Sequence, residues 1–505
     1  MPKFVFLWTD IALFLLVLAV VFYAWQISRS ETSRATWGRV LRNGPAMGSA
    51  VVLLFFVTVG LLDSVHFQPR LPKAADAPAN APVVYSSRVV SLLDTLLDHT
   101  ALQHKEKTYS APLAWLQFTK ESILQEGGEP YRDFPRLRFG GSHLDDPQAQ
   151  WLRDVTTRAS LGAAAGLGSA LALWVLVIAL IIRSRRRHEK SNTDGALQDK
   201  LSGWGSVFSE VIRGHSDIPW RVMLTTATVL LSVFGVTFGL ASGYHVLGTD
   251  QTGNDVLWQA LKSIRTAWVI GSLTTVAMLP PAIIFGLAAG YFKGWIDDVI
   301  QYVYTTLTAI PGVLLIAAAV LMMQVYINNN QDLFQTAAQR ADLRLFLLCM
   351  ILGLTGWAGL CRLLRAEALK LRELEYVQAA RAFGISHLRV IARHLLPNVM
   401  HIVLITVVLE FSGLVLYEAV LSYLGIGVDP TMNSFGTMID KSRTEMSRDP
   451  MVWWNLLAAF VFMLTLVLSA NLFADGVRDA FDPRSRAFRP TRRSRLLALI
   501  QRGST

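Results

Sequence analysis

Residues 362–398 read RLLRAEALKLRELEYVQAARAFGISHLRVIARHLLPN. The spacing of their apolar residues predicts two amphipathic helical pieces that flank Gly384, and Pro397 ends the second piece before the next apolar run. Ala379, Ala380 and Gly384 form a small surface on which another protein can pack close to the backbone, and the surrounding charges suit a helix that docks in a groove. The alternative is an ordinary basic loop between two apolar helices.

Apolar runs of about 20 residues, the length that crosses the hydrocarbon core of a bilayer as a helix, occur on both sides of this segment and along the chain. Nine spans are predicted, at 6–25, 45–63, 161–182, 222–242, 265–291, 299–326, 344–361, 400–423 and 452–475. No small-residue cleavage site follows the first run, so we expect an uncleaved helix there. The sequence therefore predicts an all-α polytopic membrane protein.

The composition agrees with this prediction. Only 17% of the 505 residues are charged, against about 25% in soluble proteins. The two cysteines exclude a disulfide framework. In a membrane protein the net charge of +10 indicates cytoplasmic loops beside anionic lipid, and not a nucleic-acid partner.

The basic residues outside the spans also predict the topology. They gather at 29–42, 183–190, 362–393 and 484–495. All four groups can be cytoplasmic only if the N-terminus is outside and the number of spans is odd, as nine is. We therefore expect an outside N-terminus and a cytoplasmic C-terminus.

Residues 64–158 then lie outside the membrane and form a small external domain or lid. They begin with QPRLPKAADAPANAP, a Pro- and Ala-rich linker that should be extended. The valines and leucines after Ser87 have helical spacing, with Ser86 or Ser87 as the predicted N-cap.

Catalytic signatures are missing from the chain. It contains no GxxxxGK[ST], HExxH, GxSxG or CxxC motif, and its ten histidines show no paired metal-ligand spacing. We therefore expect neither an enzyme nor a metal site, and any ATP hydrolysis must occur on another chain.

The sequence of the 376–398 segment carries a family resemblance. YVQAARAFGISHLRVIARHLLPN resembles the EAA loop of ABC-importer permeases, in the form found in dipeptide and oligopeptide permeases. Gln378 stands where the general pattern has Glu, and His394 where it has Ile. The positions that fit in spacing are Ala379, Ala380, Gly384, Leu396 and Pro397.

Four further segments resemble the C-type subunit of these permeases, in the same order. They are LGTDQTGNDVL (247–257), AGYFKGWIDDVIQYVYTTLTAIPGVLL (289–315), LSYLGIGVDPTMNSFGTM (421–438) and NLFADGVRDAFDPR (471–484). Asn254 replaces the usual Arg, Phe435 the usual Trp and Ala474 the usual Gly. The resemblance covers roughly 245–484 and leaves most of 1–220 unexplained.

The resemblance implies a type I importer permease of the bacterial cytoplasmic (inner) membrane, which moves di- or oligopeptides inward. It implies a second, B-type permease subunit, two ABC ATPase subunits and an extracytoplasmic binding protein. This chain would hold no cofactor, since ATP and Mg²⁺ bind the ATPases. The residues implied to couple to the ATPases are Tyr376, Gln378, Ala379, Ala380, Gly384, His394 and Pro397.

Four acidic residues are candidates for the transport pathway or its gate. Glu410 and Glu418 lie in span eight without a basic residue, and an ionisable group inside a span is a functional candidate, here for a peptide ammonium. The alternative is that Glu418 lies near the outer interface and hydrogen-bonds a neighbouring helix. Asp250 and Asp255 either line the outer gate, meet the binding protein or cap the helix start that follows.

The predicted division of the chain has five parts. They are a two-helix extension (1–63), the external insert (64–158), an extra helix with a basic linker (159–220), a six-helix permease core with its EAA loop at 362–398 (221–484), and a basic tail (485–505). Alternatively, span two within 42–67 is the first core helix and 64–242 is one insertion. In both cases the insert is expected to contact the binding protein or cover the outer mouth.

Two rival functions stay open at this point. Within the family, the solute could be nickel or another small solute. Outside it, the chain could be a self-sufficient secondary transporter or channel, which would predict inverted repeats and broken helices at the midplane. No clear repeat is seen.

Overall fold

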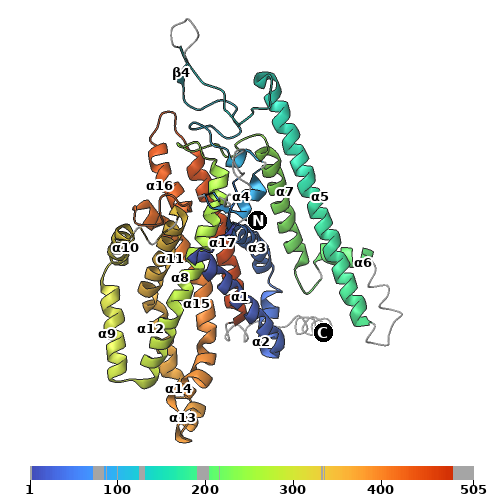
Figure 1. The fold of residues 1–505 in the computed structure, drawn as a ribbon. Helices are drawn as coiled ribbons and strands as arrows, with labels where there is room; N and C mark the ends of the chain where they lie inside the picture. Colours follow the sequence, from blue (N-terminus) through green and yellow to red (C-terminus); the bar gives the residue numbers. More distant parts are fainter. Residues whose placement is uncertain are drawn as a thin grey trace, which may run out of the picture.

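The computed structural model describes residues 3–71, 85–86, 88–98, 100–123, 131–189, 204–214, 216–330, 332, 334 and 336–481 (Figure 1). Within these residues, nine helices are long and apolar enough to cross a membrane. They are Trp8–Arg29, Gly44–Asp63, Pro147–Arg185, Trp220–Ala241, Val256–Phe292, Gly312–Asn329, Ala337–Leu371, His387–Tyr423 and Trp454–Phe481. The prediction of an all-α polytopic membrane protein is confirmed.

The elements up to residue 241 are, in order, β1 (Lys3–Phe4), α1 (Trp8–Arg29), α2 (Glu31–Val40), α3 (Gly44–Asp63), β2 (His66–Gln68), β3 (Val90–Ser91), α4 (Leu92–Leu97), the 3₁₀ turn η1 (Ala101–Gln103), β4 (Glu121–Ile123), β5 (Tyr131–Asp133), α5 (Pro147–Glu189), α6 (Trp204–Arg213) and α7 (Trp220–Ala241). Strands β1, β2 and β3 form one small antiparallel sheet, and β4 and β5 form a hairpin.

The remaining elements are α8 (Val256–Phe292), α9 (Trp295–Ala309), α10 (Gly312–Asn329), α11 (Ala337–Gly356), α12 (Ala358–Leu371), α13 (Glu375–Ala382), α14 (His387–Val390), the π turn η3 (Ile391–Leu395), α15 (Leu396–Tyr423), α16 (Phe435–Glu445) and α17 (Trp454–Phe481). Helices α8, α11, α12, α15 and α17 pack together with α3. Helices α3, α8, α15 and α17 contribute to the main core, whereas α11 and α12 pack in separate clusters.

Prolines act differently in spans five and six. Pro280 and Pro281 lie inside α8, which stays continuous. At Ile310 and Pro311, in contrast, the backbone is extended, and the expected single span 299–326 divides into α9 and α10. Since proline disfavours a helical conformation in the residue before it, Ile310 ends α9.

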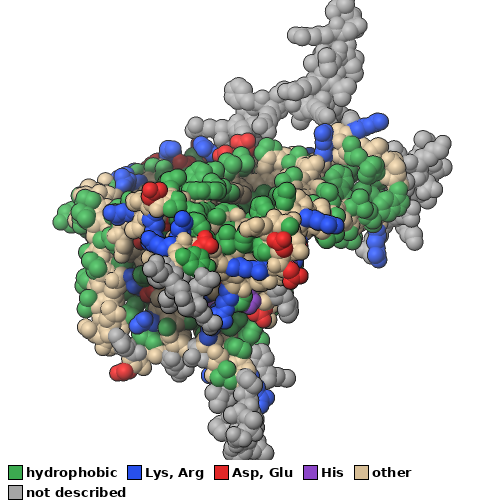
Figure 2. Space-filling view, turned by 90° about the horizontal axis from the view of Figure 1, so that it is seen from above, with side chains coloured by type: hydrophobic (Ala, Val, Ile, Leu, Met, Phe, Trp, Pro, Cys, Tyr) green, Lys and Arg blue, Asp and Glu red, His purple; other side chains and the backbone are tan. Residues whose placement is uncertain are grey.

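The two ends of the molecule carry different parts of the chain (Figure 1). The β4–β5 hairpin lies at one end and α13 and α14 lie at the other. Strand β1 pairs with β2, which directly follows α3, so the N-terminus lies with the 64–158 segment. Figure 2, which views this end, shows acidic and basic side chains mixed over its surface.

The 64–158 segment contains one short helix near its predicted position. Val90 and Ser91 form strand β3, and α4 begins at Leu92. Ser91 is its N-cap and forms a capping box with Asp94, so the prediction of Ser86 or Ser87 as the cap was wrong. Most of the Pro- and Ala-rich linker, at 72–84, lies outside the described residues, as do the linker 190–203 and the tail after 481.

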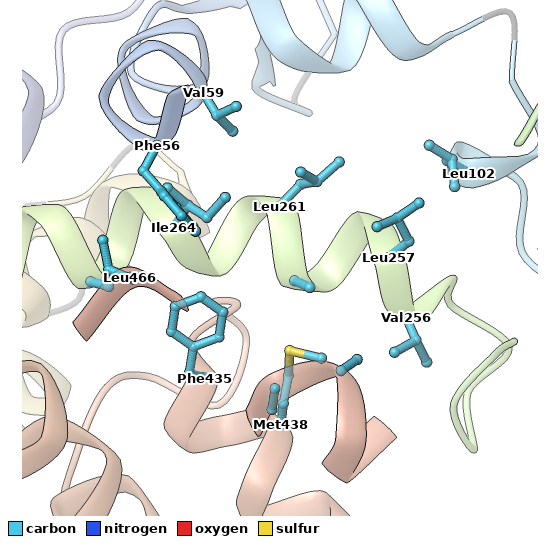
Figure 3. Packing of buried hydrophobic residues seen from close by; sticks show 14 of the residues in the cluster. Phe56, Val59, Leu102, Val256, Leu257, Leu261, Ile264, Phe435, Met438 and Leu466 are labelled. Carbon is cyan, nitrogen blue, oxygen red and sulfur yellow. The ribbon is translucent and has the colours of Figure 1, made fainter. Parts of the chain in front are cut away.

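The main hydrophobic core joins this segment to the spanning helices (Figure 3). Phe56 and Val59 of α3 and Leu261 and Ile264 of α8 meet residues of α16 and α17. The other residues labelled in Figure 3 are Leu102, Val256, Leu257, Phe435, Met438 and Leu466. Leu102 comes from the 64–158 segment, so that segment is part of the fold and not a detached lid.

Helices α3 and α7, the two candidates for the first core helix, pack differently. Helix α3 lies along α17 and α8, whereas α7 lies along α5 and also touches α3. A Cβ at Gly162 or Gly166 of α5 would clash with backbone carbonyls at Gly235 or Leu231 of α7. Small residues therefore let the two backbones approach closely, and α5 and α7 form a tight hairpin.

Candidate functional site

Helices α13 and α14, within the predicted coupling loop (residues 362–398), form the tip opposite the 64–158 segment (Figure 1). Helix α13 ends in a Schellman motif, in which Gly384 N–H donates to Arg381 and Ile385 N–H donates to Ala380. Gly384 has φ +75°, a left-handed conformation in which glycine carries no steric penalty. The predicted turn at Gly384 between two helical pieces is confirmed.

The sequence analysis predicted that Pro397 ends the second helical piece, and this prediction was wrong. The chain from His387 to Tyr423 is one continuous helix, and Pro397 lies in the first turn of α15. Because proline has no N–H, it cannot bond to the carbonyl one turn earlier. The wider π turn Ile391–Leu395 directly precedes it, and the helix continues through both.

Polar contacts hold the coupling loop against the end of α8. Arg372 Nη1 donates to the Tyr291 carbonyl at 2.7 Å, and the Tyr291 hydroxyl lies 2.8 Å from His387 Nδ1. Lys293 Nζ lies 3.0 Å from Glu373 Oε1 in an exposed ion pair, and hydrogen bonding to this lysine lowers the pKa of Glu373. The loop therefore has a defined position before any partner binds.

A second ion pair joins α12 to α9. Arg365 donates to both carboxylate oxygens of Asp297, at 2.6 and 2.7 Å. The hydrogen bonds from Arg365 lower the pKa of Asp297. This bidentate geometry fixes the orientation of the two helices at the base of the loop.

The tip of the loop exposes apolar side chains. Phe383 is 85% exposed and Leu388 is 78% exposed, on either side of Gly384. Beside them lies a hollow of about 560 Å³ lined by Gln378, Arg381, Ala382, Gly384, Ile385, Ser386 and His387. Arg389 and Arg393 are exposed and form no ion pair within the described part of the chain. Exposed large apolar residues next to unpaired cations are typical of a binding surface.

The structure brings some of the predicted coupling residues together and separates others. The rings of Tyr376 and His394 lie 6.0 Å apart, and Asn398 donates to the Tyr376 hydroxyl. Gln378 donates to the Glu373 carbonyl. Ala379 is exposed, whereas Ala380 is buried beneath it. Only part of the predicted set, including Tyr376, Gln378, Ala379 and Gly384, can therefore be reached by a partner.

Asp250 and Asp255 are both buried at the start of α8. Asp255 accepts from Trp258 N–H as the N-cap, which confirms the capping alternative for this residue. Asp250 accepts from Thr252 and Asn254 and from the Gln259 side chain. Both carboxylates thus have partners that hold the turn.

Glu410 and Glu418, both on α15, differ in burial. Glu418 is buried and accepts from Ser422 at 2.6 Å, and also from Ser434 and Gly436 at the start of α16. Glu418 thus bonds a neighbouring helix, as the structural alternative predicts. Glu410 is exposed and has no hydrogen bond or ion pair to a described residue.

A buried ionic network was missed by the sequence analysis. Arg265 of α8 contacts Asp10 of α1 at 2.6 Å, Asp342 of α11 at 3.4 Å and Ser64 at 3.3 Å. One turn earlier, Lys262 lies 2.7 Å from Asp63 and 2.8 Å from Asp94. Asp10 and Arg265 both fall within predicted spans, so the rule that directed attention to Glu410 would also have found them.

A second buried cluster joins the 64–158 segment to the turn before α8. His245 Nδ1 lies 2.8 Å from Asp255, and its Nε2 lies 3.4 Å from Glu106. Burial alone would lower the pKa of His245, but the two carboxylates outweigh it and raise this pKa to about 9. Glu106 also accepts three backbone N–H groups, from Arg138, Phe139 and Gly140, and its pKa falls to about 2 despite burial.

The described residues contain no group of His, Cys, Asp and Glu side chains that could hold a metal ion.

Comparison with known proteins finds a family match for the part of the chain that includes residues 362–398. Residues 282–487 match the family model described as binding-protein-dependent transport system inner membrane component.

Several curated relatives cover a longer part of the chain. The oligopeptide transport system permease protein OppC of Mycobacterium tuberculosis is 34% identical over 245 residues, which cover 48% of this chain and 78% of the relative. The OppC protein of Haemophilus influenzae is 28% identical over 54% of this chain and 77% of its own length. The dipeptide transport system permease protein DppC of Bacillus subtilis is 28% identical over 48% of this chain and 70% of its own length.

Proposed function

This chain belongs to the family of binding-protein-dependent transport system inner membrane components, and we propose that it is the permease subunit of an ATP-driven importer of di- and oligopeptides. The names of the relatives support peptides as the solute. Nine apolar helices among the described residues support a multi-pass membrane protein. We further propose a second permease subunit and a binding protein as partners.

The observation that carries this proposal is the exposed tip of the coupling loop. One of two separate ATPase subunits would take Phe383 and Leu388 into a groove, and Gly384 lets the chain turn there without a side chain in the way. ATP would hold the ATPases closed and bias the spanning helices outward-facing, and hydrolysis would release them. ATP and Mg²⁺ would bind those subunits and not this chain.

We assign the coupling-loop end to the cytoplasm and the 64–158 segment to the outside. The basic residues near α2, α5 and the coupling loop support this orientation. The N-terminus pairs with β2 and would therefore be outside. The exposed Tyr131 and Phe134 beside the β4–β5 hairpin are candidates for contact with the binding protein.

We also propose α3 as the first core helix, with 64–242 as one insertion. Its packing along α8 and α17 supports this assignment over α7. On the pathway, we keep Glu410 as the candidate, because its carboxylate has no partner among the described residues while the other three acidic residues do.

The substrate can be tested in membranes that contain the complete importer. We expect ATP-dependent uptake of a labelled dipeptide and a labelled tetrapeptide, with mutual competition. Uptake of ⁶³Ni²⁺ that peptides do not reduce would contradict the peptide assignment. Peptide uptake by the purified chain alone in proteoliposomes would contradict the importer class.

The coupling role can be tested at Gly384. In Gly384→Trp, a bulky side chain at φ +75° would block docking, and we expect peptide uptake and substrate-stimulated ATP hydrolysis to fall at least about tenfold. Gly425→Trp is the matched control, because Gly425 is also exposed with φ +74° and an open surrounding but lies outside the coupling loop. Equal loss in both variants would show that backbone strain, and not docking, is the cause.

The pathway role can be tested at Glu410. Glu410→Gln should lower uptake of peptides with a free ammonium about threefold or more, roughly the strength of a weak exposed charge contact. Uptake of N-acetylated peptides should stay unchanged. Equal effects on both substrates would contradict a direct contact.

A further inference from the structure

Helix α6 is amphipathic, and among the described residues only one of its apolar faces is covered by protein. Val207 and Val211 are buried against Ile178 and Ile182 of α5 and Leu224 of α7. Trp204, Phe208 and Ile212 recur every four residues and are 43–51% exposed. A helix with such a second apolar stripe, and with tryptophan at one end, is typical of an element that lies in the membrane interface.

The exposed stripe borders a hollow of about 700 Å³ between α5, α6 and α7. Leu167, Leu171 and Val175 of α5 line the opposite wall. Trp174 Nε1 donates to Thr228 Oγ1, so these two polar groups of the lining satisfy each other. Water in this hollow would therefore find few hydrogen-bond partners, and an apolar occupant is favoured.

Three arginines lie close in the chain to residues that line the hollow. Arg213 directly follows Ile212, Arg183 follows Ile178 by five residues on α5, and Arg221 is the second residue of α7. All three are exposed and form no ion pair within the described ranges, whereas Arg185 pairs with Glu210 at 2.9 Å. Figure 1 shows α6 beside the end of α5 that points away from the 64–158 segment.

We propose that the hollow between α5, α6 and α7 binds an anionic phospholipid of the leaflet on the coupling-loop side. Its acyl chains would fill the apolar hollow, and its phosphate would contact Arg183, Arg213 and Arg221. Charge complementarity and continuity with the lipid-facing surface of the helices both select this occupant. The inference requires that the chain spans the membrane, but it is independent of what the chain transports.

The test uses the full-length chain, purified in detergent and stripped of lipid, with bound lipid counted by native mass spectrometry. The probes are dioleoyl phosphatidylglycerol, dioleoyl phosphatidylcholine, glycerol 1-phosphate and inorganic phosphate. We expect one phosphatidylglycerol to bind at least about fivefold more tightly than phosphatidylcholine. The soluble phosphates should not displace it. Equal binding of the two lipids, or displacement by phosphate alone, would overturn the proposal.

Variants then place the lipid at α6. Replacing Arg183, Arg213 and Arg221 by Gln should weaken phosphatidylglycerol binding roughly fivefold for each arginine removed. Arg153→Gln is the control, since Arg153 is an exposed and unpaired arginine near the other end of α5. Phe208→Glu, which places an acid in the hollow, should abolish the preferred binding of one lipid. Unchanged binding in both kinds of variant would locate the lipid elsewhere and refute the assignment.

Discussion

The two ends of the molecule differ in whether their charged side chains have partners within the chain. At the end that carries the 64–158 segment, Arg265 and His245 are buried and Lys262 is partly buried, and each lies within ion-pair distance of at least two carboxylates. At the coupling-loop end, Arg389 and Arg393 are exposed and unpaired in the described chain, beside exposed Phe383. The three cations of the first end have their partners within the chain, whereas the two arginines of the coupling-loop end are available for a partner.

Removal of Arg265 should give the largest effect and would test the first half of this comparison. Arg265→Leu leaves Asp10 and Asp342 buried without their cation, and breaking a buried pair in this way costs about 3–5 kcal/mol. The measurement is thermal unfolding of the full chain in detergent. Lys293→Ala is the control, because it removes an exposed, solvent-screened pair at the coupling-loop end and should lower stability far less. A similar loss of thermal stability in the two variants would contradict the proposed difference between the two ends.

The buried His245 cluster predicts a pH dependence. The pKa of His245 is about 9 in the fold against about 6.5 in the unfolded chain, so protonated His245 stabilises the fold fully below pH 6.5. This contribution, up to about 3 kcal/mol, should be lost as the pH rises from 6.5 to 9. Unfolding measured across this range should show the decline in the wild type. His245→Asn should be less stable at pH 6 and nearly independent of pH, and a variant that keeps the decline would refute the assignment.

The smallest effect is expected at the coupling loop and should appear only in the complex. Phe383→Ser removes an exposed apolar anchor, so the isolated chain should unfold as before. Affinity for the ATPase subunits should fall roughly tenfold, the usual loss at a moderate hot spot. Co-purification and direct binding measure this. A loss of stability without loss of affinity would mean that Phe383 belongs to the fold and not to an interface.

The sequence predicts the parts of this molecule that depend on local pattern. The apolar runs give nine helices among the described residues, and the spacing around Gly384 gives the turn of the coupling loop. Asp255 as an N-cap also follows from local chemistry. Local rules fail where two of them compete. Pro397 is tolerated because a π turn precedes it, and Ser91 caps α4 because the chain before it enters a strand.

The buried networks could not be predicted from the sequence, because they join distant parts of the chain. Asp10 and Arg265 are 255 positions apart, and the sequence around either residue does not indicate which residue is its partner. The same holds for Glu106, whose carboxylate reaches His245 and the backbone of Arg138. Such pairs depend on how helices pack, and one chain without its relatives does not encode that packing in any local period.

The close approach of α5 and α7 also bears on how this chain acquired its length. The glycines at 162, 166 and 235 let this hairpin satisfy most of its packing by itself, and it touches the other helices through α3. A unit of that kind could be inserted into a loop of an ancestral protein without requiring compensating substitutions in the surrounding helices. Apart from these glycines, the sequence of the hairpin should therefore tolerate substitution more readily than that of the helices around it.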